Sequence, residues 1–437
     1  MSSINFEPIT LERILERKNL AEALRKVVSN KGGAGVDGMK TLQLRCYILE
    51  HPNEISEAVR NGTYTPKPIK RVYIPKENGD KRPLGIPTVI DRFVQQAVAL
   101  VLSEEYEKIF SDNSFGFRPG RGCRDAMARA MTYLNSGLEW VIDLDLSKFF
   151  DTVNHSKLLQ ILSDRIKDGR VISLIHRFLK APISEEGKVG NKVTIGTPQG
   201  GVISPVLANV LLNELDQLLD SRGIKFVRYA DDMVIMCGSQ KAAERILQNV
   251  TEFIEKKLFL KVNKDKTKIV RASEESQFLG FAFTQRVSQK LKDAYPGTRY
   301  FPTVHKKKRV KFANSVKEIL DRRAKGGIAT VKRKLEMKIR GWSNYFYGAV
   351  PDSWMKETDA WIRRRVRQLL WKQWKKPGKR LEEFRKRAKR VPLKSEYAYS
   401  SNRYWTMSMT PVIHRILSNK RLLSEGWATL EQFAWKG

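Results

Sequence analysis

The chain has 437 residues and carries 81 Lys and Arg side chains against 47 Asp and Glu, a formal net charge of +34 at pH 7. A hydrophobic fraction of 41%, with nine Trp and 19 Phe, is enough to build folded cores, which excludes a disordered polycation. The three cysteines are widely spaced, which excludes a disulfide framework and paired zinc ligands. No apolar run is long enough to span a membrane or to direct secretion, so we expect a cytoplasmic protein.

The first half of the chain alternates between helical and strand-like periodicity. Its predicted elements are a helix over 9–30 that ends at the glycine-rich stretch 31–35, a hairpin over 72–87, a helix over 91–109, a strand over 140–146 and a helix near 155–166. The hairpin turns around Asn78-Gly79, a pair that favours tight turns.

The second half begins with a long helix from Ser204 to about 220, in which Ser is a good N-cap and Pro205 suits the first helical position. A hairpin over 226–236, a helix over 240–257 and a short strand pair around 278–283 follow, and then basic helices over 311–323, 328–346 and 353–374. Pro377-Gly378 marks a boundary before an irregular, basic and aromatic tail. Residues 305–437 hold 35 Lys and Arg against 11 Asp and Glu, which together with the Trp and Tyr side chains indicates binding to a nucleic acid.

Two adjacent carboxylates, Asp231 and Asp232, lie between short apolar runs and are predicted to occupy the tip of the hairpin. Like charges this close repel, and each raises the pKa of the other. A divalent cation relieves the repulsion, and phosphoryl-transfer enzymes with two metal ions need such clusters. A solvated acidic turn is the alternative interpretation of an isolated Asp-Asp pair.

A second acidic element precedes the hairpin by about 85 residues. Asp143 and Asp145 are two residues apart on the strand predicted over 140–146, so their side chains share one face. A strand end that places one carboxylate beside the hairpin pair gives three acids around two metal ions, the arrangement of nucleotidyl transfer. For the strand alone, surface acids on an edge strand are the alternative.

The order of these motifs resembles the reverse transcriptases, most closely those encoded by bacterial group II introns. The matching blocks are 71–87 with 91–96, Ser114-Phe115-Gly116-Phe117-Arg118-Pro119, the strand that contains Asp145, Gly196-Thr197-Pro198-Gln199-Gly200-Gly201-Val202-Ile203-Ser204-Pro205, Tyr229-Ala230-Asp231-Asp232, 261–268 and Phe278-Leu279-Gly280-Phe281. The resemblance implies an α+β right-hand polymerase: fingers and a palm with an antiparallel sheet, an α-helical thumb or maturase domain, and a small basic C-terminal domain. The implied boundaries are an N-terminal extension over 1–30, fingers and palm over 31–300, thumb or maturase domain over 301–376, and a DNA-binding domain over 377–437.

The resemblance also implies roles for individual residues. Asp145, Asp231 and Asp232 correspond to the catalytic carboxylates, and the implied metal-binding positions are Asp145, Leu146, Asp231 and Asp232, with Asp143 as the alternative if the strand register differs by two. The implied nucleotide-binding residues are Lys76, Arg82, Phe150, Gln199, Gly200 and Lys266. In the family, a bulky ring at the position of Phe150 clashes with a 2′-OH and so selects deoxynucleotides.

The basic C-terminal third resembles the maturase domain of intron-encoded proteins, and the implied RNA-binding residues are Arg340, Trp342, Arg363, Arg364, Arg365 and Arg367. No Cys/His cluster follows, as in the class that lacks the zinc-bearing endonuclease, and that class takes its primer from another source.

The function implied is that of an RNA-directed DNA polymerase and splicing maturase that copies its intron RNA into DNA during retrohoming. The implied partners are group II intron RNA, an RNA template with a DNA primer, target DNA and dNTPs, with two Mg²⁺ ions (Mn²⁺ as the alternative) and a ribonucleoprotein as the setting. A stand-alone reverse transcriptase of phage defence or diversity generation and a non-catalytic RNA-binding splicing factor are the alternatives. The oligomeric state, monomer or homodimer, stays open.

Overall fold

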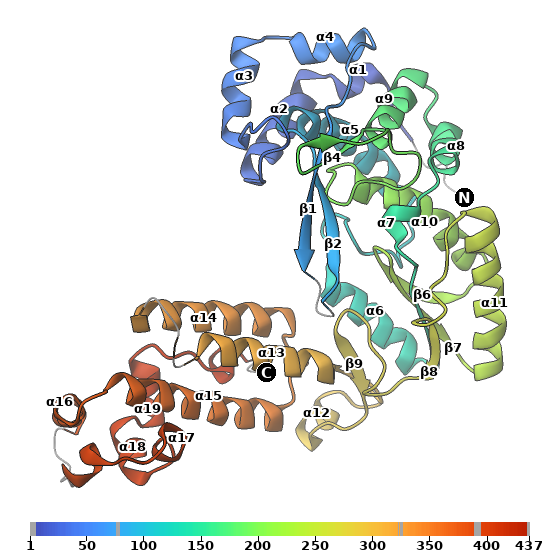
Figure 1. Ribbon diagram of the computed structural model, residues 1–437. Helices are drawn as coiled ribbons and strands as arrows, with labels where there is room; N and C mark the ends of the chain where they lie inside the picture. The colour runs from blue at the N-terminus through green and yellow to red at the C-terminus, as the bar shows by residue number, and fades with distance from the viewer. Residues whose placement is uncertain (1–5, 76–78, 322, 324–326, 389–394, 435–437) are drawn as a thin grey trace. The chain divides into compact units, whose positions relative to one another are not determined.

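The computed structural model describes residues 6–75, 79–321, 323, 327–388 and 395–434, and the chain forms two compact units, 1–271 and 272–437 (Figure 1). The helices described in the first unit are α1 (Leu11–Ile14), α2 (Arg17–Ser29), α3 (Leu44–Glu50), α4 (Glu54–Arg60), α5 (Val89–Glu107), α6 (Cys123–Asn135), α7 (Phe149–Thr152), α8 (His155–Arg165), α9 (Gly169–Leu179), α10 (Ser204–Ser221) and α11 (Gln240–Lys257), with a 3₁₀ helix at Thr41–Gln43.

The strands described in the first unit form two sheets. One sheet has the order β2-β1-β4-β5 and consists of β1 (Ile69–Pro75), β2 (Lys81–Ile86), β4 (Ile183–Glu185) and β5 (Lys188–Val189). The other has the order β6-β7-β3-β8 and consists of β6 (Lys225–Tyr229), β7 (Asp232–Cys237), β3 (Trp140–Leu144) and β8 (Lys268–Arg271). Every pair in the second sheet is antiparallel, whereas β1 and β4 are parallel in the first. The unit is therefore of mixed helix and sheet composition, as predicted.

Helices α5 and α10 supply much of the core of the first unit. Val98 and Leu102 of α5, Leu211 and Leu215 of α10, and Ile235 of β7 have no exposed surface and belong to one cluster. These apolar positions recur every three to four residues on the helices, which turns one stripe of each helix toward the same core.

The described part of the second unit consists of a two-stranded sheet and helices of up to 22 residues. Its described elements are β9 (Phe281–Thr284), α12 (Gln289–Ala294), β10 (Phe301–Val304), α13 (Lys306–Ile319), α14 (Gly327–Tyr345), α15 (Asp352–Gln373), α16 (Pro377–Arg387), α17 (Tyr404–Met407), α18 (Pro411–Ile416), α19 (Asn419–Ser424) and 3₁₀ helices at Ser395–Tyr399 and Leu430–Phe433. The tail after 377, predicted to be irregular, is thus largely helical. Phe384 and Ile413 of this tail share a buried cluster with Leu335 of α14 and Leu370 of α15.

The contacts group the chain into two units, and the predicted domain boundaries stay a prediction. The predicted boundaries fall at 30, 300 and 376, whereas the contacts separate the chain between Arg271 and Ala272. Asp359 of α15 accepts the backbone N–H groups of Leu430 and Glu431 at 2.7 and 3.0 Å, so the last 3₁₀ helix is bound to α15. Residues on both sides of position 376 therefore belong to one folded unit.

Two local predictions are corrected. The helix expected over 9–30 is broken between α1 and α2, where the Asn19 amide donates to the carbonyls of Ile14 (2.7 Å) and Ala97 (3.0 Å). Ser204 is not an N-cap: the helix begins at Ser204, and its hydroxyl donates to the Pro198 carbonyl at 3.0 Å. In both places a polar side chain bonds to a carbonyl outside its own helix, which apolar periodicity does not encode.

Candidate active site

The register of the second sheet brings the predicted carboxylates to one end of it. β3 and β7 pair with Asp143 opposite Val234 and Leu144 opposite Met233. Extended by one residue, the same antiparallel register places Asp145, just past the end of β3, opposite Asp232 at the start of β7. Tyr229 pairs with Asp232 across the turn, so Ala230 and Asp231 are the two turn residues.

Ala230 adopts a positive φ of 59°, which a two-residue hairpin turn requires and which a non-glycine residue adopts at a cost. Gly116 packs against this turn so closely that a Cβ on it would lie 2.3 Å from the Ala230 nitrogen. The sequence marked Gly116 only as part of a motif. The structure shows why a side chain is excluded there.

The electrostatics match a cluster of like charges in a partly desolvated site. Burial, with smaller contributions from the charges of Asp231, Asp143 and Asp145, raises the pKa of Asp232 to about 6. Burial, with a smaller contribution from Asp145, also raises the pKa of Asp143 to about 6 against the opposing charge of Lys268. The pKa of Asp231 is raised chiefly by burial and by Asp145, while Arg82 and Arg228 lower it.

Asp145 has partners from the segment that precedes β8. Its carbonyl accepts the Asn263 backbone N–H at 2.8 Å, and its carboxylate accepts the Asn263 side-chain amide at 2.9 Å. The ammonium of Lys266 lies 3.4 Å from the same carboxylate oxygen. Leu146 pairs with Val262 in an isolated bridge. Lys266, a predicted site residue, thus lies at the carboxylates, and Asn263 is a site residue that the sequence analysis did not single out.

The donor set suits a hard divalent cation, because it consists of carboxylate oxygens whose mutual repulsion a cation would relieve. Within the described ranges, however, no three acidic, His or Cys side chains lie close enough to hold one ion as they stand. Asp145, Asp231 and Asp232 are the residues that could hold such ions, with the Asn263 and Lys266 contacts fixing one of them.

The described members of the predicted nucleotide-binding set lie on β2, on α7 and in loops of the first unit. Arg82 is an exposed residue of β2, paired with Ile74, and its charge acts on Asp231. Lys76 lies outside the described residues. Phe150 is half-buried on α7 and lines a cavity of about 290 Å³ with Arg71, Ile183 and Gln199.

The loop that carries Gln199 and Gly200 is bonded to the elements on both sides of it. The Thr197 N–H donates to the Phe150 carbonyl, and the Gly85 N–H of β2 donates to the Gln199 carbonyl, each at 2.6 Å. Gly200 has a φ of +108°, and a Cβ on it would lie 2.4 Å from the Gly85 oxygen. Only glycine fits this position. Through its two hydrogen bonds the loop connects α7, at Phe150, with the β1–β2 hairpin.

The predicted RNA-binding residues are mostly engaged inside the second unit. The Arg364 guanidinium lies 3.6 Å from the Trp405 ring centroid, and that of Arg365 lies 5.5 Å from the Trp361 centroid. Arg367 is 3% exposed, and it donates to the Leu417 carbonyl (2.9 Å) and to Asn419 Oδ1 (2.8 Å). Burial lowers the pKa of Arg367 to about 10.

The remaining members of that set differ in exposure. Arg340 is exposed, pairs with Glu336 and lies 5.5 Å from the Phe433 ring centroid. Arg363 is half-buried. Trp342 is half-buried, with its ring centroid 4.5 Å from that of Phe312 and 5.4 Å from that of Trp354. Their role in RNA binding stays a prediction.

Comparison with known proteins gives the family. Residues 74–283 match the model of the reverse transcriptases (RNA-dependent DNA polymerases), and residues 309–390 match the group II intron maturase-specific domain. The chain belongs to the group II intron-encoded reverse transcriptases. It is thus an RNA-directed DNA polymerase with a maturase domain, as the sequence motifs predicted.

Three relatives show how far the likeness extends. Protein YkfC of Escherichia coli is 34% identical over 350 residues, which cover 71% of this chain and 90% of YkfC. The group II intron-encoded protein LtrA of Lactococcus lactis is 30% identical over 335 residues, 62% of this chain and 55% of LtrA. The putative COX1/OXI3 intron 2 protein of Saccharomyces cerevisiae is 28% identical over 62% of this chain and 38% of its own length. The chain therefore matches only about half of LtrA. Among the helices described, none is long and apolar enough to cross a membrane.

Proposed function

We propose that this reverse transcriptase copies RNA into DNA at Asp145, Asp231 and Asp232 by two-metal nucleotidyl transfer. The observation that carries the proposal is the antiparallel register, which brings Asp145 beside Asp232 and the turn residue Asp231. Mg²⁺, or alternatively Mn²⁺, would be held by these carboxylates together with the Leu146 position. When bound, the ions supply activation of the attacking 3′-oxygen and neutralisation of the triphosphate.

The surrounding residues bind and select the nucleotide in this proposal. Arg82, together with Lys76, binds the triphosphate, because a guanidinium and an ammonium both suit phosphate oxygens. Phe150 excludes the 2′-OH of a ribonucleotide, and the cavity that it lines with Gln199 supports this role. Gly200 permits close approach of the loop, and Lys266 is the candidate donor of a proton to pyrophosphate.

The second unit binds the group II intron RNA as a splicing maturase in this proposal, and the polymerase later copies that RNA during retrohoming into target DNA. Support comes from the maturase-specific match and from the net charge of +24 over 305–437. Of the predicted contacts, Arg340 is exposed, Arg367 is buried and supports the unit from inside, and the other four are half-buried. The working form of such a protein is a ribonucleoprotein.

Primer extension on an RNA template with a DNA primer, dNTPs and Mg²⁺ tests the proposal. Asp231→Asn keeps the size of the side chain but removes a carboxylate, so it should abolish cDNA synthesis while leaving the melting temperature and RNA affinity close to wild type. Extension retained by Asp231→Asn would contradict the catalytic assignment. Absence of cDNA from the wild type, together with tight salt-sensitive RNA binding, would instead favour a non-catalytic splicing factor.

A further inference from the structure

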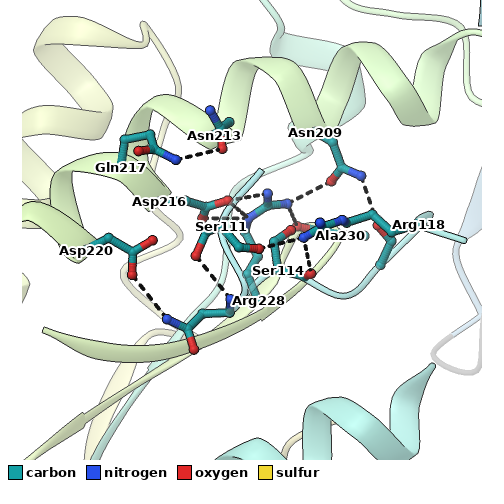
Figure 2. A network of polar contacts seen from close by, with 12 residues as sticks. Ser111, Ser114, Arg118, Asn209, Asn213, Asp216, Gln217, Asp220, Arg228 and Ala230 are labelled. Carbon is teal, nitrogen blue, oxygen red and sulfur yellow. Dashed lines mark hydrogen bonds and ion pairs between the residues drawn. The ribbon is translucent and has the colours of Figure 1, made fainter. Parts of the chain in front are cut away.

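A fully buried arginine lies beneath the turn that carries Asp231. Arg228 of β6 is 1% exposed, and its side-chain Nε donates to both carboxylate oxygens of Asp216, at 2.8 and 3.0 Å. Asp216 is a residue of α10 with no exposed surface. Figure 2 shows the guanidinium between α10 and the hairpin. The backbone of Arg228 is also fixed, because its N–H donates to the Asn113 carbonyl (2.8 Å) and its carbonyl accepts the Phe115 N–H (2.9 Å).

The other side of the guanidinium reaches the turn itself. Nη1 of Arg228 donates to the Ala230 carbonyl at 3.0 Å and to Asn209 Oδ1 at 2.9 Å (Figure 2). The Asn209 amide in turn donates to the Gly116 carbonyl at 2.9 Å, and Gly116 is the residue that packs against the Ala230 nitrogen. The turn is therefore held on both sides of Ala230 by groups that converge on one arginine.

Stability alone is a poor explanation for this arrangement. A buried ion pair pays a desolvation penalty, and replacing both partners with apolar residues of similar volume is often neutral or stabilising. What a guanidinium adds is direction, because its planar donors are fixed relative to one another. Ala230 needs such a constraint, since its positive φ is unfavourable for a residue with a Cβ.

We propose that Arg228, oriented by Asp216 and Asn209, is a positioning residue that holds Ala230 in its turn conformation and so aims Asp231 at the reacting groups. The proposal rests on the proposed function for its catalytic consequence. The conformational part, that this network holds the turn, stands without it. Arg228 itself touches neither substrate nor metal ion in this proposal.

The test is the paired substitution Arg228→Met with Asp216→Leu in the full chain, which removes the network without leaving a buried charge unpaired. Hydrogen–deuterium exchange of the metal-free protein should show faster exchange in the segment 226–236, with exchange in α11 unchanged. In primer extension, kcat should fall by about 10- to 100-fold, the range typical of residues that support metal ligands, with the KM for template–primer unchanged. Wild-type exchange of 226–236 in the paired variant would overturn the proposal.

Two further variants separate positioning from stability and from charge. Leu219→Ala removes a buried side chain one turn beyond Asp216 and should lower the melting temperature without lowering kcat. A loss of kcat in Leu219→Ala as large as that in the paired variant, at an equal loss of stability, would also overturn the proposal. Arg228→Lys keeps the charge but not the planar donors, so its kcat should be lower than that of the wild type. Full activity of Arg228→Lys would show that only the charge of Arg228 is needed, which would overturn the positioning role.

The failure of the proposed function is distinguishable from the failure of this inference. If wild type makes no cDNA, the polymerase assignment fails, but the exchange rate of 226–236 still decides whether the network holds the turn. If wild type makes cDNA and Asp231→Asn does not, the kcat of the paired variant decides whether the held turn matters for catalysis.

Discussion

At the scale of single residues, the candidate active site is surrounded by close contacts, and each of them holds the turn or one carboxylate in place. Gly116 contacts the turn nitrogen, Asn263 donates twice to Asp145, and Arg228 donates to the Ala230 carbonyl. None of these residues would itself take part in the chemistry. They lie one contact away from residues that would, which is where small displacements lower the rate of a positioned reaction.

Gly116→Ala should therefore abolish or strongly reduce cDNA synthesis. The added Cβ would lie 2.3 Å from the Ala230 nitrogen, so the turn must move. The matched control is Gly122→Ala, whose Cβ would meet only Asp125 Oδ2 at 3.6 Å, an ordinary contact. Primer extension and thermal unfolding of both variants check this. Equal activity of the two alanine variants would show that the turn tolerates displacement.

Phe150→Ala should allow the enzyme to incorporate ribonucleotides. The ring lines the cavity beside Gln199, and its removal would leave space for a 2′-OH. The measurement is the ratio of kcat/KM for a dNTP and the matching rNTP. We expect this ratio to fall by at least about tenfold, which corresponds to about 1.4 kcal/mol of lost discrimination. An unchanged ratio would assign Phe150 to core packing with Phe149.

At the scale of elements, helix ends connect distant parts of the first unit. Asp168 is the N-cap of α9, where its side chain accepts the Arg170 N–H, and it also accepts the Leu11 N–H at 2.9 Å. One carboxylate thus satisfies an orphan donor of α9 and one of α1. The hydrogen bond from the Arg170 guanidinium is the main cause that lowers the pKa of Asp168 to about 2, with the Leu11 bond adding to it.

This lowered pKa predicts a pH-dependent contribution to stability. A carboxyl with a folded-state pKa of about 2 and an ordinary value of 3.8 stabilises the fold above about pH 4, and the contribution is lost as the pH falls toward 2. Asp168→Asn, which keeps a capping oxygen, should lower the free energy of unfolding by about 1 kcal/mol at pH 7, a discounted value because Arg170 is half exposed. Denaturant unfolding at pH 7 and pH 3 measures it. A difference between the two proteins that does not shrink at pH 3 would contradict this account.

At the scale of the whole molecule, charge and aromatic residues have two separate uses. The second unit places several guanidinium groups on Trp rings, such as Arg380, 4.3 Å from the Trp371 centroid, and Arg364 on Trp405. These cations pack the unit. Others are exposed on α14, where Arg333 and Lys334 lie in solvent beside Met337. We expect the exposed cations to contribute most to the neutralisation of RNA phosphates.

The double variant Arg333→Gln with Lys334→Gln should weaken RNA binding and reduce the slope of log K against log salt by about 1 to 2, since each lost phosphate contact lowers the slope by roughly 0.7 to 0.9. Arg367→Gln is the matched comparison, because Arg367 is buried and bonded to Leu417 and Asn419. It should lower the melting temperature with little change in the slope. Binding to a group II intron RNA between 50 and 300 mM salt measures both. If Arg367→Gln changed the slope more than the double variant did, Arg367 would have to be assigned as a direct RNA contact.

The sequence by itself determined many of the elements and the family to which the chain belongs. Alternation in 72–87 and 226–236 and helical spacing in 91–109 and 204–220 are local patterns, and each matches an element of the structure within a few residues. The seven motif blocks in their order along the chain, those of Asp145, Asp231 and Asp232 among them, predicted the family that residues 74–283 match.

Only the tertiary structure decided which residues meet. Asn263 reaches Asp145 across 118 positions, and Arg228 reaches Asp216 on another element. β8, absent from the sequence prediction, completes the sheet through its pairing with β3, and Arg367 lies inside the second unit although its sequence suggested a surface. The physical reason is the range of the forces: periodicity reports which face of an element is apolar, whereas strand pairing, ion pairs and burial depend on what packs against that face.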